Sequence, residues 1–337
     1  MLLTHDAVRH IDALADALGV LSIFVGSRRS RDATILGQAV PLGRRLDRLT
    51  DLDDDPSPRE RRAAVRSCLR RLRPRMTDLV TRSGGRGGAL FAGLSSGDVL
   101  EVVTGMPLPI AARLEPTGYV RPLVAALDEG EPAGVLLAHR HRVRLLDWRM
   151  GVLVPVSDGG FAARAAAASH AAEAAREHGW RRLVVDGDPL LAGSLLAGEA
   201  ELRSCSIAVA TRSLGRLSAP SLVQAVAAEL ESVQRRREVA LVHDAVDASR
   251  RGEEAVLGVD QAARALTAGR VSHLLFDNDR EQLAWPGQRL VEAGLSIDPA
   301  ERLIELALDS AATITPVEGR AARALDSGDG VVGLLRW

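Results

Sequence analysis

Three short apolar segments in succession, followed by alternating helix and strand, constrain the fold of this chain more than any other feature. The first two, GVLLAHR and RVRLLDW, meet at a basic turn, and GVLVPV follows closely. Strands joined by so few residues pair antiparallel, whereas strands separated by helices pair in parallel. The pattern therefore predicts a mixed sheet with helices packed against it, ending in a long helix from Ser218 to about Arg250.

The 337 residues exceed what one hydrophobic core usually covers, and we predict three domains. Residues 1–130 form an N-terminal α/β domain, which opens with an amphipathic helix over MLLTHDAVRHIDALADALG. Residues 131–250 contain the central mixed sheet. Residues 251–337 alternate helix and strand and predict a small C-terminal α/β/α sandwich, so the whole chain is a multidomain α/β protein.

All 43 basic residues are arginine, and this excludes any mechanism that needs a lysine, such as a P-loop or a Schiff base. Cys68 and Cys205 have no Cys or His at metal-ligand spacing, so neither a disulfide framework nor a metal site is predicted. The chain carries no dinucleotide-binding glycine fingerprint, and we expect no cofactor. Without an apolar run of membrane-spanning length or a signal peptide, it is expected to be cytoplasmic and to have no membrane partner.

A row of arginines follows one face of the helix predicted after Ser57 and Pro58, two residues that favour a helix start. Apolar residues recur at helical spacing on another face. Such a row can lie along a phosphate backbone, or it can be a solvated face neutralised by the preceding acidic run DRLTDLDDD; both interpretations remain open. The candidate RNA-binding residues of the row are Arg59, Arg62, Arg66, Arg70 and Arg73.

Three stretches resemble the archaeal and eukaryotic class-I peptide-chain release factor family, in its divergent bacterial branch. They are AGVLLAHRHRVRLLDWRMG, RRLVVDGDPLLAGSLL and AVLGVDQAARALTAGRVSHLLFD, and the resemblance covers about residues 130–337. It implies a central ribonuclease-H-like domain and a C-terminal domain like the ribosomal proteins that bind kink-turn RNA. It also implies a ribosomal partner, with rRNA and tRNA contacts, and a translational GTPase as a partner of the C-terminal domain.

The same resemblance places the family's Gly-Gly-Gln motif at Gly159, Gly160 and Phe161. In the family the glycines let the backbone approach the end of peptidyl-tRNA, and the glutamine contributes a backbone N–H and a side-chain amide near the ester. Phe161 keeps the N–H group and lacks the amide. The alternative interpretation is a flexible strand-to-helix turn, in which Asp158 satisfies N–H groups of the following helix.

Two further groups of residues are candidates for chemistry. Arg140, His141 and Arg142 occupy the predicted hairpin tip, where basic residues can contact RNA or can simply be solvated. Asp186 and Asp188 follow the apolar run LVV, a place where α/β enzymes often carry catalytic groups, although Asp188 can equally cap the next helix.

The sequence favours a ribosome-binding translation factor that acts in rescue, quality control or hibernation, without ordinary stop-codon-dependent peptide release. An enzymatic function is not favoured, but two enzymatic hypotheses remain. One is peptidyl-tRNA hydrolysis through the backbone of residues 159–161. The other is a metal-dependent nuclease that uses Asp186.

Overall fold

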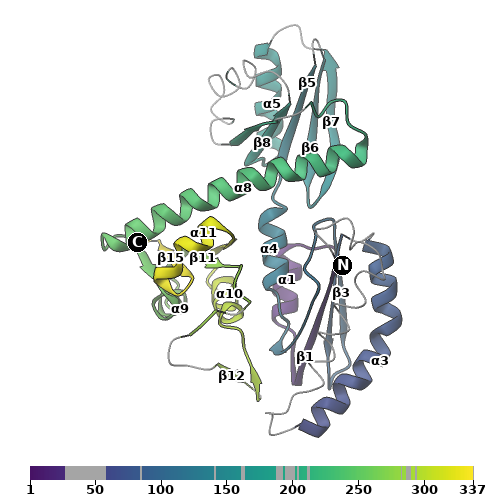
Figure 1. The fold of residues 1–337 in the computed structure, drawn as a ribbon, viewed down its shortest axis with the longest axis vertical. Coiled ribbons are helices and arrows are strands. Elements are labelled where there is room, and N and C mark those ends of the chain that lie inside the picture. The colour runs from purple at the N-terminus through teal and green to yellow at the C-terminus, as the bar shows by residue number, and fades with distance from the viewer. Residues whose placement is uncertain are drawn as a thin grey trace. The chain divides into compact units, whose positions relative to one another are not determined.

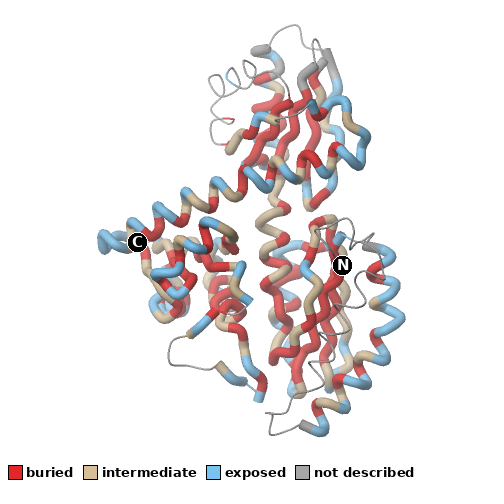
Figure 2. The backbone as a smooth tube through the Cα atoms, viewed as in Figure 1, coloured by how far each residue is buried: buried red, intermediate tan, exposed pale blue. Residues whose placement is uncertain are grey.

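The computed structural model describes residues 1–26, 58–83, 86–139, 142–160, 164–186, 193, 202, 205–210, 213–281, 283–285, 290–292 and 294–336 (Figure 1). The chain divides into two compact units, residues 1–128 with 241–337, and residues 129–240. The predicted mixed α/β multidomain fold is confirmed, with one main sheet in each of the three predicted segments. Buried positions run along the strands of each sheet (Figure 2).

The first segment contains an antiparallel sheet in the order β3-β2-β1-β4. One face is covered by α3, whose buried residues Val65, Leu72 and Leu79 share a core with β1 and β2. The elements of this segment are α1 (His5–Asp12), β1 (Ala15–Gly26), α3 (Pro58–Ser83), β2 (Gly87–Gly93), β3 (Val99–Thr104), β4 (Ala111–Thr117) and α4 (Arg121–Glu129).

The helix predicted over the first 19 residues is wrong in length, because α1 ends at Asp12 and β1 begins at Ala15. Gly19 has a φ of +104°, which no helix residue adopts. Asp16, near the start of β1, also binds the backbone, since its carboxylate accepts the N–H groups of Leu18, Ser95 and Ser96. A side chain that bonds the backbone in this way stabilises a non-helical conformation.

The central segment forms a five-stranded sheet in the order β7-β6-β5-β8-β9. β5, β6 and β7 pair antiparallel, whereas β5–β8 and β8–β9 are parallel, so the predicted mixed sheet is confirmed. Helix α5 packs on it through a row of small residues that includes Ala168, Ala171 and Ala175. The elements are β5 (Ala133–His139), β6 (Arg142–Arg149), β7 (Val152–Gly160), α5 (Arg164–His178), β8 (Arg182–Asp186) and β9 (Ser206–Val209).

The long helix predicted from Ser218 is confirmed as α8 (Ala219–Arg250). It contributes buried residues to both units, among them Val226 and Leu230 to one and Val242 and Val246 to the other.

The third segment carries a sheet in the order β10-β15-β11-β14, in which only the β11–β14 pair is parallel. A two-residue hairpin pair, β12–β13, extends from it. The elements are β10 (Ala255–Leu257), α9 (Val259–Thr267), β11 (Val271–Asp277), β12 (Val291–Glu292), β13 (Leu295–Ser296), α10 (Pro299–Asp309), β14 (Thr313–Val317), α11 (Arg320–Ala324) and β15 (Val331–Leu335).

Candidate nucleic-acid interface

Helix α3 begins at Pro58 and presents the predicted arginine row on its outer face. Four of the five arginines, Arg59, Arg66, Arg70 and Arg73, are exposed, whereas Arg62 is partly buried and has an interaction partner. At 100° per residue the five side chains fall within one narrow stripe that runs for about 21 Å along the helix. We call Arg59, Arg66, Arg70 and Arg73 the arginine stripe.

The packing of α3 determines which way the stripe faces. Val65, Leu72 and Leu79 have no exposed surface, and Leu69 and Met76 pack partly against the same core. At 100° per residue, these residues lie on an adjoining side of the helix, centred about 100° from the stripe. Burial of this apolar face therefore orients α3 so that the guanidinium groups of the stripe point into solvent.

Two other arginines of α3 are paired within the fold, and the stripe arginines have no such pair in the part of the chain that the structure describes. Arg82 pairs with Asp78 at 2.7 Å and with Glu101 at 2.6 Å, and Arg75 lies 3.8 Å from Glu101. Within the described part of the chain, none of the four stripe arginines has an ion-pair partner. Among the described residues, the stripe is thus a row of positive charges that no acidic side chain neutralises.

Arg61 was not singled out by the sequence, and it has a structural role. Its side chain is only 3% exposed, and its Nε donates to the carbonyl oxygen of Leu18 at 3.1 Å. Burial lowers the pKa of this guanidinium and raises that of the nearby Cys68 thiol. The sequence alone does not show that Arg61 is buried, because Arg61 and Arg62 are adjacent and differ only in the direction in which their side chains leave the helix.

The predicted hairpin tip is only partly described by the structure. Arg140 and His141 lie outside the described residues, whereas Arg142 begins β6. The side-chain position of Arg142 is also outside the description. RNA contact by these three residues therefore stays a prediction.

Gly159 and Gly160 are the last two residues of β7, not a loop after it. Gly159 is paired with Val143 and Gly160 with Arg142 in the antiparallel ladder. Phe161 lies outside the described residues. The glycines thus stand at the end of an edge strand, and their approach to a ligand stays a prediction.

Two polar contacts near this strand end were not indicated by the sequence. Ser157 Oγ lies 2.9 Å from His170 Nε2, and Arg144 lies 3.6 Å from Asp158. Ser157 follows an irregularity in the β6–β7 register, and His170 lies on α5. The contact joins the edge strand to the covering helix. Asp158 pairs with the β6 arginine, and its capping of the following helix stays a prediction.

Asp186 ends β8 and is 4% exposed. Its Oδ2 accepts the backbone N–H of Gly215 at 2.8 Å, which ties the segment before α8 to the sheet. Asp188 lies outside the described residues. Among the residues that the structure places, no three His, Cys, Asp or Glu side chains form a group suited to a metal ion. Helices able to cross a membrane are likewise not found among them.

Residues 119–163 match the family model described as bacterial archaeo-eukaryotic release factor family 10. The matched residues run from the start of α4 through β5, β6 and β7 to just beyond the glycine pair. The expected resemblance to the release factor family is therefore confirmed. No curated protein sequence matches the chain.

Several solved structures are also similar to this chain. An archaeal translation termination factor, aRF1, is 15% identical with a TM-score of 0.28, over 100% of this chain and 99% of its own. Dom34 of S. cerevisiae is 10% identical with a TM-score of 0.45, over 74% of this chain and 79% of its own. A ribosome-bound archaeal Pelota is 10% identical with a TM-score of 0.43, over 100% and 95%. These TM-scores are too low to support a functional inference.

Proposed function

We propose that this release-factor-like chain is a cytoplasmic ribosome-associated translation factor that acts by binding, in ribosome rescue, quality control or hibernation. The observation that carries the proposal is the arginine stripe, four exposed guanidinium groups in line on α3 without ion-pair partners among the described residues. The family match at residues 119–163 supports a role in translation.

The stripe suits an RNA backbone for physical reasons. Arg66, Arg70 and Arg73 follow one another at spacings of four and three residues, which places their Cβ atoms about 5–6 Å apart, and each guanidinium can donate two hydrogen bonds to a phosphate. Displacing counterions from the RNA then favours binding. The whole chain has a net charge of only −1, so it does not attract RNA over its whole surface. Four arginines on one face of α3 attract RNA to that face.

Binding without ordinary peptide release follows from the position matched to the family's glutamine. Phe161 has no amide to place near an ester, so it lacks one of the two donors that would stabilise developing charge. The chain around it is not basic, since residues 157–179 contain two arginines against Asp158, Glu173 and Glu177. A segment of this charge gains little from entering an RNA-walled channel.

The third segment is better suited to a protein partner than to RNA. Residues 251–337 contain nine arginines against 14 acidic residues, a net charge of −5. Repulsion from phosphate weakens RNA contact, whereas complementary charge can direct a protein with a basic surface to this segment. A translational GTPase is the partner class that we propose for it.

Co-sedimentation of the full chain with ribosomes tests the proposal. We expect binding at low salt that weakens steeply as salt increases, and enrichment on stalled or idle ribosomes over translating ones. Failure to sediment with ribosomes even at low salt would contradict the proposed function.

A further inference from the structure

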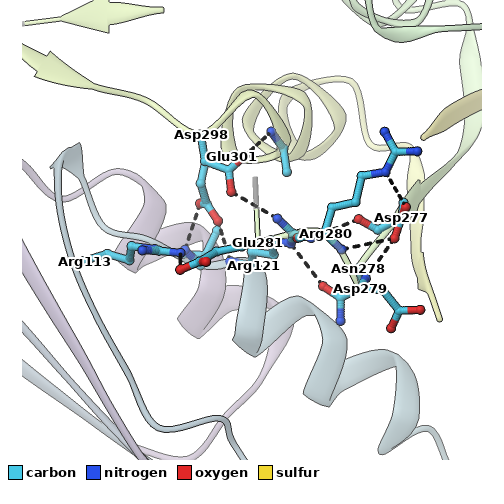
Figure 3. A network of polar contacts seen from close by, with 11 residues as sticks. Arg113, Arg121, Asp277, Asn278, Asp279, Arg280, Glu281, Asp298 and Glu301 are labelled. Atoms are coloured by element: carbon cyan, nitrogen blue, oxygen red, sulfur yellow. Dashed lines mark hydrogen bonds and ion pairs between the residues drawn. The ribbon is translucent and has the colours of Figure 1, made fainter. Parts of the chain in front are cut away.

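The first and third segments meet at a buried polar network centred on Arg121, the first residue of α4 (Figure 3). Its side chain is 4% exposed and makes four hydrogen bonds, all to the third segment. Nε donates to Asn278 Oδ1 at 3.1 Å and Nη1 to Asp298 Oδ2 at 3.1 Å. Nη2 donates to the carbonyl oxygens of Asp277 at 2.9 Å and Arg280 at 2.7 Å. All of this lies within one compact unit.

The start of α4 is capped from the other segment. Glu301 of α10 accepts the N–H of Val120 at 2.9 Å and the N–H of Arg121 at 2.7 Å. The first N–H groups of a helix have no partner within it, and here a carboxylate about 180 residues away supplies one. Asp298 caps α10 in turn, since its Oδ1 accepts the N–H of Ala300 at 3.0 Å. The two helix starts are thus held by side chains of one cluster.

This cluster contains more buried acid than buried base. Glu115, Asp298 and Glu301 are 5%, 1% and 6% exposed, and Arg121 is the one guanidinium buried among them in the described residues. Arg113 stands at the edge, where it pairs with Glu281. The charged groups that face Glu115 are Arg113 on its own strand, Arg121 at the start of α4, and Asp298 and Glu301 at the start of α10. Tyr119 lies beside Glu301 and Arg121, and Asp277, Arg280 and Glu281 complete the network (Figure 3).

Full ionisation of these three carboxyl groups would leave a net negative charge in a space without water. Burial and the neighbouring Asp298 raise the pKa of Glu115 to about 8. Burial and the charge of Glu115 also raise the pKa of Glu301, against the N–H groups of Val120 and Arg121. Glu301 receives two backbone donors and Glu115 one, from Asp298, so these hydrogen bonds favour the ionised form at Glu301 more than at Glu115.

We propose that Glu115, Arg121, Asp298 and Glu301 form a proton-dependent clasp, which holds the first and third segments together while Glu115 carries a proton and weakens when that proton leaves. In the closed clasp, Arg121 pairs with Asp298, the N–H groups of Val120 and Arg121 bind Glu301, and neutral Glu115 adds no charge. Once Glu115 ionises, a third buried carboxylate opposes the other two, and opening relieves the repulsion by admitting water.

The clasp has a consequence beyond RNA binding. It joins the sheet that carries α3 to the acidic third segment, so its state changes how rigidly these two surfaces are connected. A rigid connection fixes the distance between an RNA contact and a protein contact, whereas an open one lets each bind separately.

Hydrogen exchange of the full chain, read by mass spectrometry and corrected for the intrinsic pH dependence of exchange, tests the clasp. Peptides that cover the first turn of α4 report on opening, because the N–H groups of Val120 and Arg121 are bonded to Glu301. Because the pKa of Glu115 is about 8, its ionisation should reduce the protection of these α4 peptides about tenfold between about pH 7 and pH 9. Peptides from β5, in the other unit, should keep a constant protection. Unchanged protection at α4 in the wild-type chain would overturn the proposal.

Two variants separate the clasp from a general effect of pH. Glu115→Gln keeps the shape and cannot ionise, so protection of the first turn of α4 should become independent of pH over this range. The matched control is Glu254→Gln, an exposed acid, which should retain the wild-type slope. A Glu115→Gln chain with the wild-type slope would show that another group holds the proton and would refute the assignment. These readouts involve no ribosome, so they stand or fall separately from the proposed function.

Discussion

Leu295, on the β12–β13 hairpin of the third segment, packs directly over Gly19 in β1 of the first segment. A Cβ atom built on Gly19 would lie 2.6 Å from Leu295 Cδ1 and 3.0 Å from Leu114 Cδ1. Leu295 is 6% exposed and belongs to the core between α3 and the first sheet. The third segment therefore completes the core of the first, and the clasp at Arg121 is its second, polar attachment.

Replacing Gly19 with alanine should destabilise this unit by about 3 kcal/mol. A side chain at its φ of +104° costs about 1–2 kcal/mol, and displacing Leu295 costs a similar amount. Urea unfolding followed by circular dichroism measures the change. Gly252→Ala is the matched control, because Gly252 also has a positive φ, +70°, but no atom within 4 Å of the added Cβ. Equal losses in the two variants would show that Leu295 does not need the space above Gly19.

Arg121→Met should cost about 3–5 kcal/mol of unfolding free energy, since it leaves Asp298 buried without its cation. Its contact 5.4 Å from the centre of the Phe276 ring is lost as well. The control is Arg250→Met, whose side chain is 64% exposed and whose pair with Asp247 should contribute under about 0.5 kcal/mol. Comparable small losses in both would contradict a central role for Arg121.

The carboxyl group of Asp12, at the end of α1, should make the free energy of unfolding depend on pH. Burial, together with Glu305 and Asp309 of α10, raises its pKa from 3.8 to about 7. A carboxyl group with a raised pKa in the folded state favours folding while it is protonated, so its contribution is lost as pH rises from about 4 to about 7. Asp12→Asn should therefore stabilise the chain at about pH 8 by about 2 kcal/mol, after allowance for its partial exposure.

Thermal or urea unfolding at several pH values measures the effect of Asp12→Asn. The variant should gain most over the wild type above about pH 7 and nothing below about pH 4. Asp244→Asn, an exposed position on α8, provides the control and should leave the pH profile unchanged. A gain that is the same at every pH would mean that Asp12 does not titrate in this range.

Peptide release distinguishes binding from hydrolysis. The chain should not release labelled peptide from ribosome complexes above the rate without protein, because Phe161 lacks the amide of the family motif. Release comparable to that of an active release factor would favour the hydrolase hypothesis. In that event Phe161→Ala, with no loss of release, would assign the activity to the backbone of the strand end.

Much of the architecture can be predicted from local patterns. Ser57 and Pro58 predict where α3 starts, and the apolar spacing of Val65 and Leu72 predicts its buried face. The mixed pairing of the central sheet follows from the lengths of the connections, as the antiparallel β5–β6 and parallel β5–β8 pairs confirm.

The clasp and the hairpin attachment could not be predicted in this way. Glu301 and Arg121 are separated by 180 residues, and neither lies in a motif that indicates the other. The strand at Ala15 was hidden because its residues also fit the helical period of α1. Such features depend on how segments distant in the sequence pack, which a single sequence does not specify.

The most direct test of the central claim compares ribosome co-sedimentation of two double variants across a salt series. Removing charge from the stripe with Arg66→Gln and Arg70→Gln should weaken binding and reduce the slope of log affinity against log salt by about two. Arg75→Gln with Arg82→Gln removes the same charge from arginines that already pair with Glu101, and this control should leave binding near wild type. Equal binding and equal slopes for the two double variants would contradict the account.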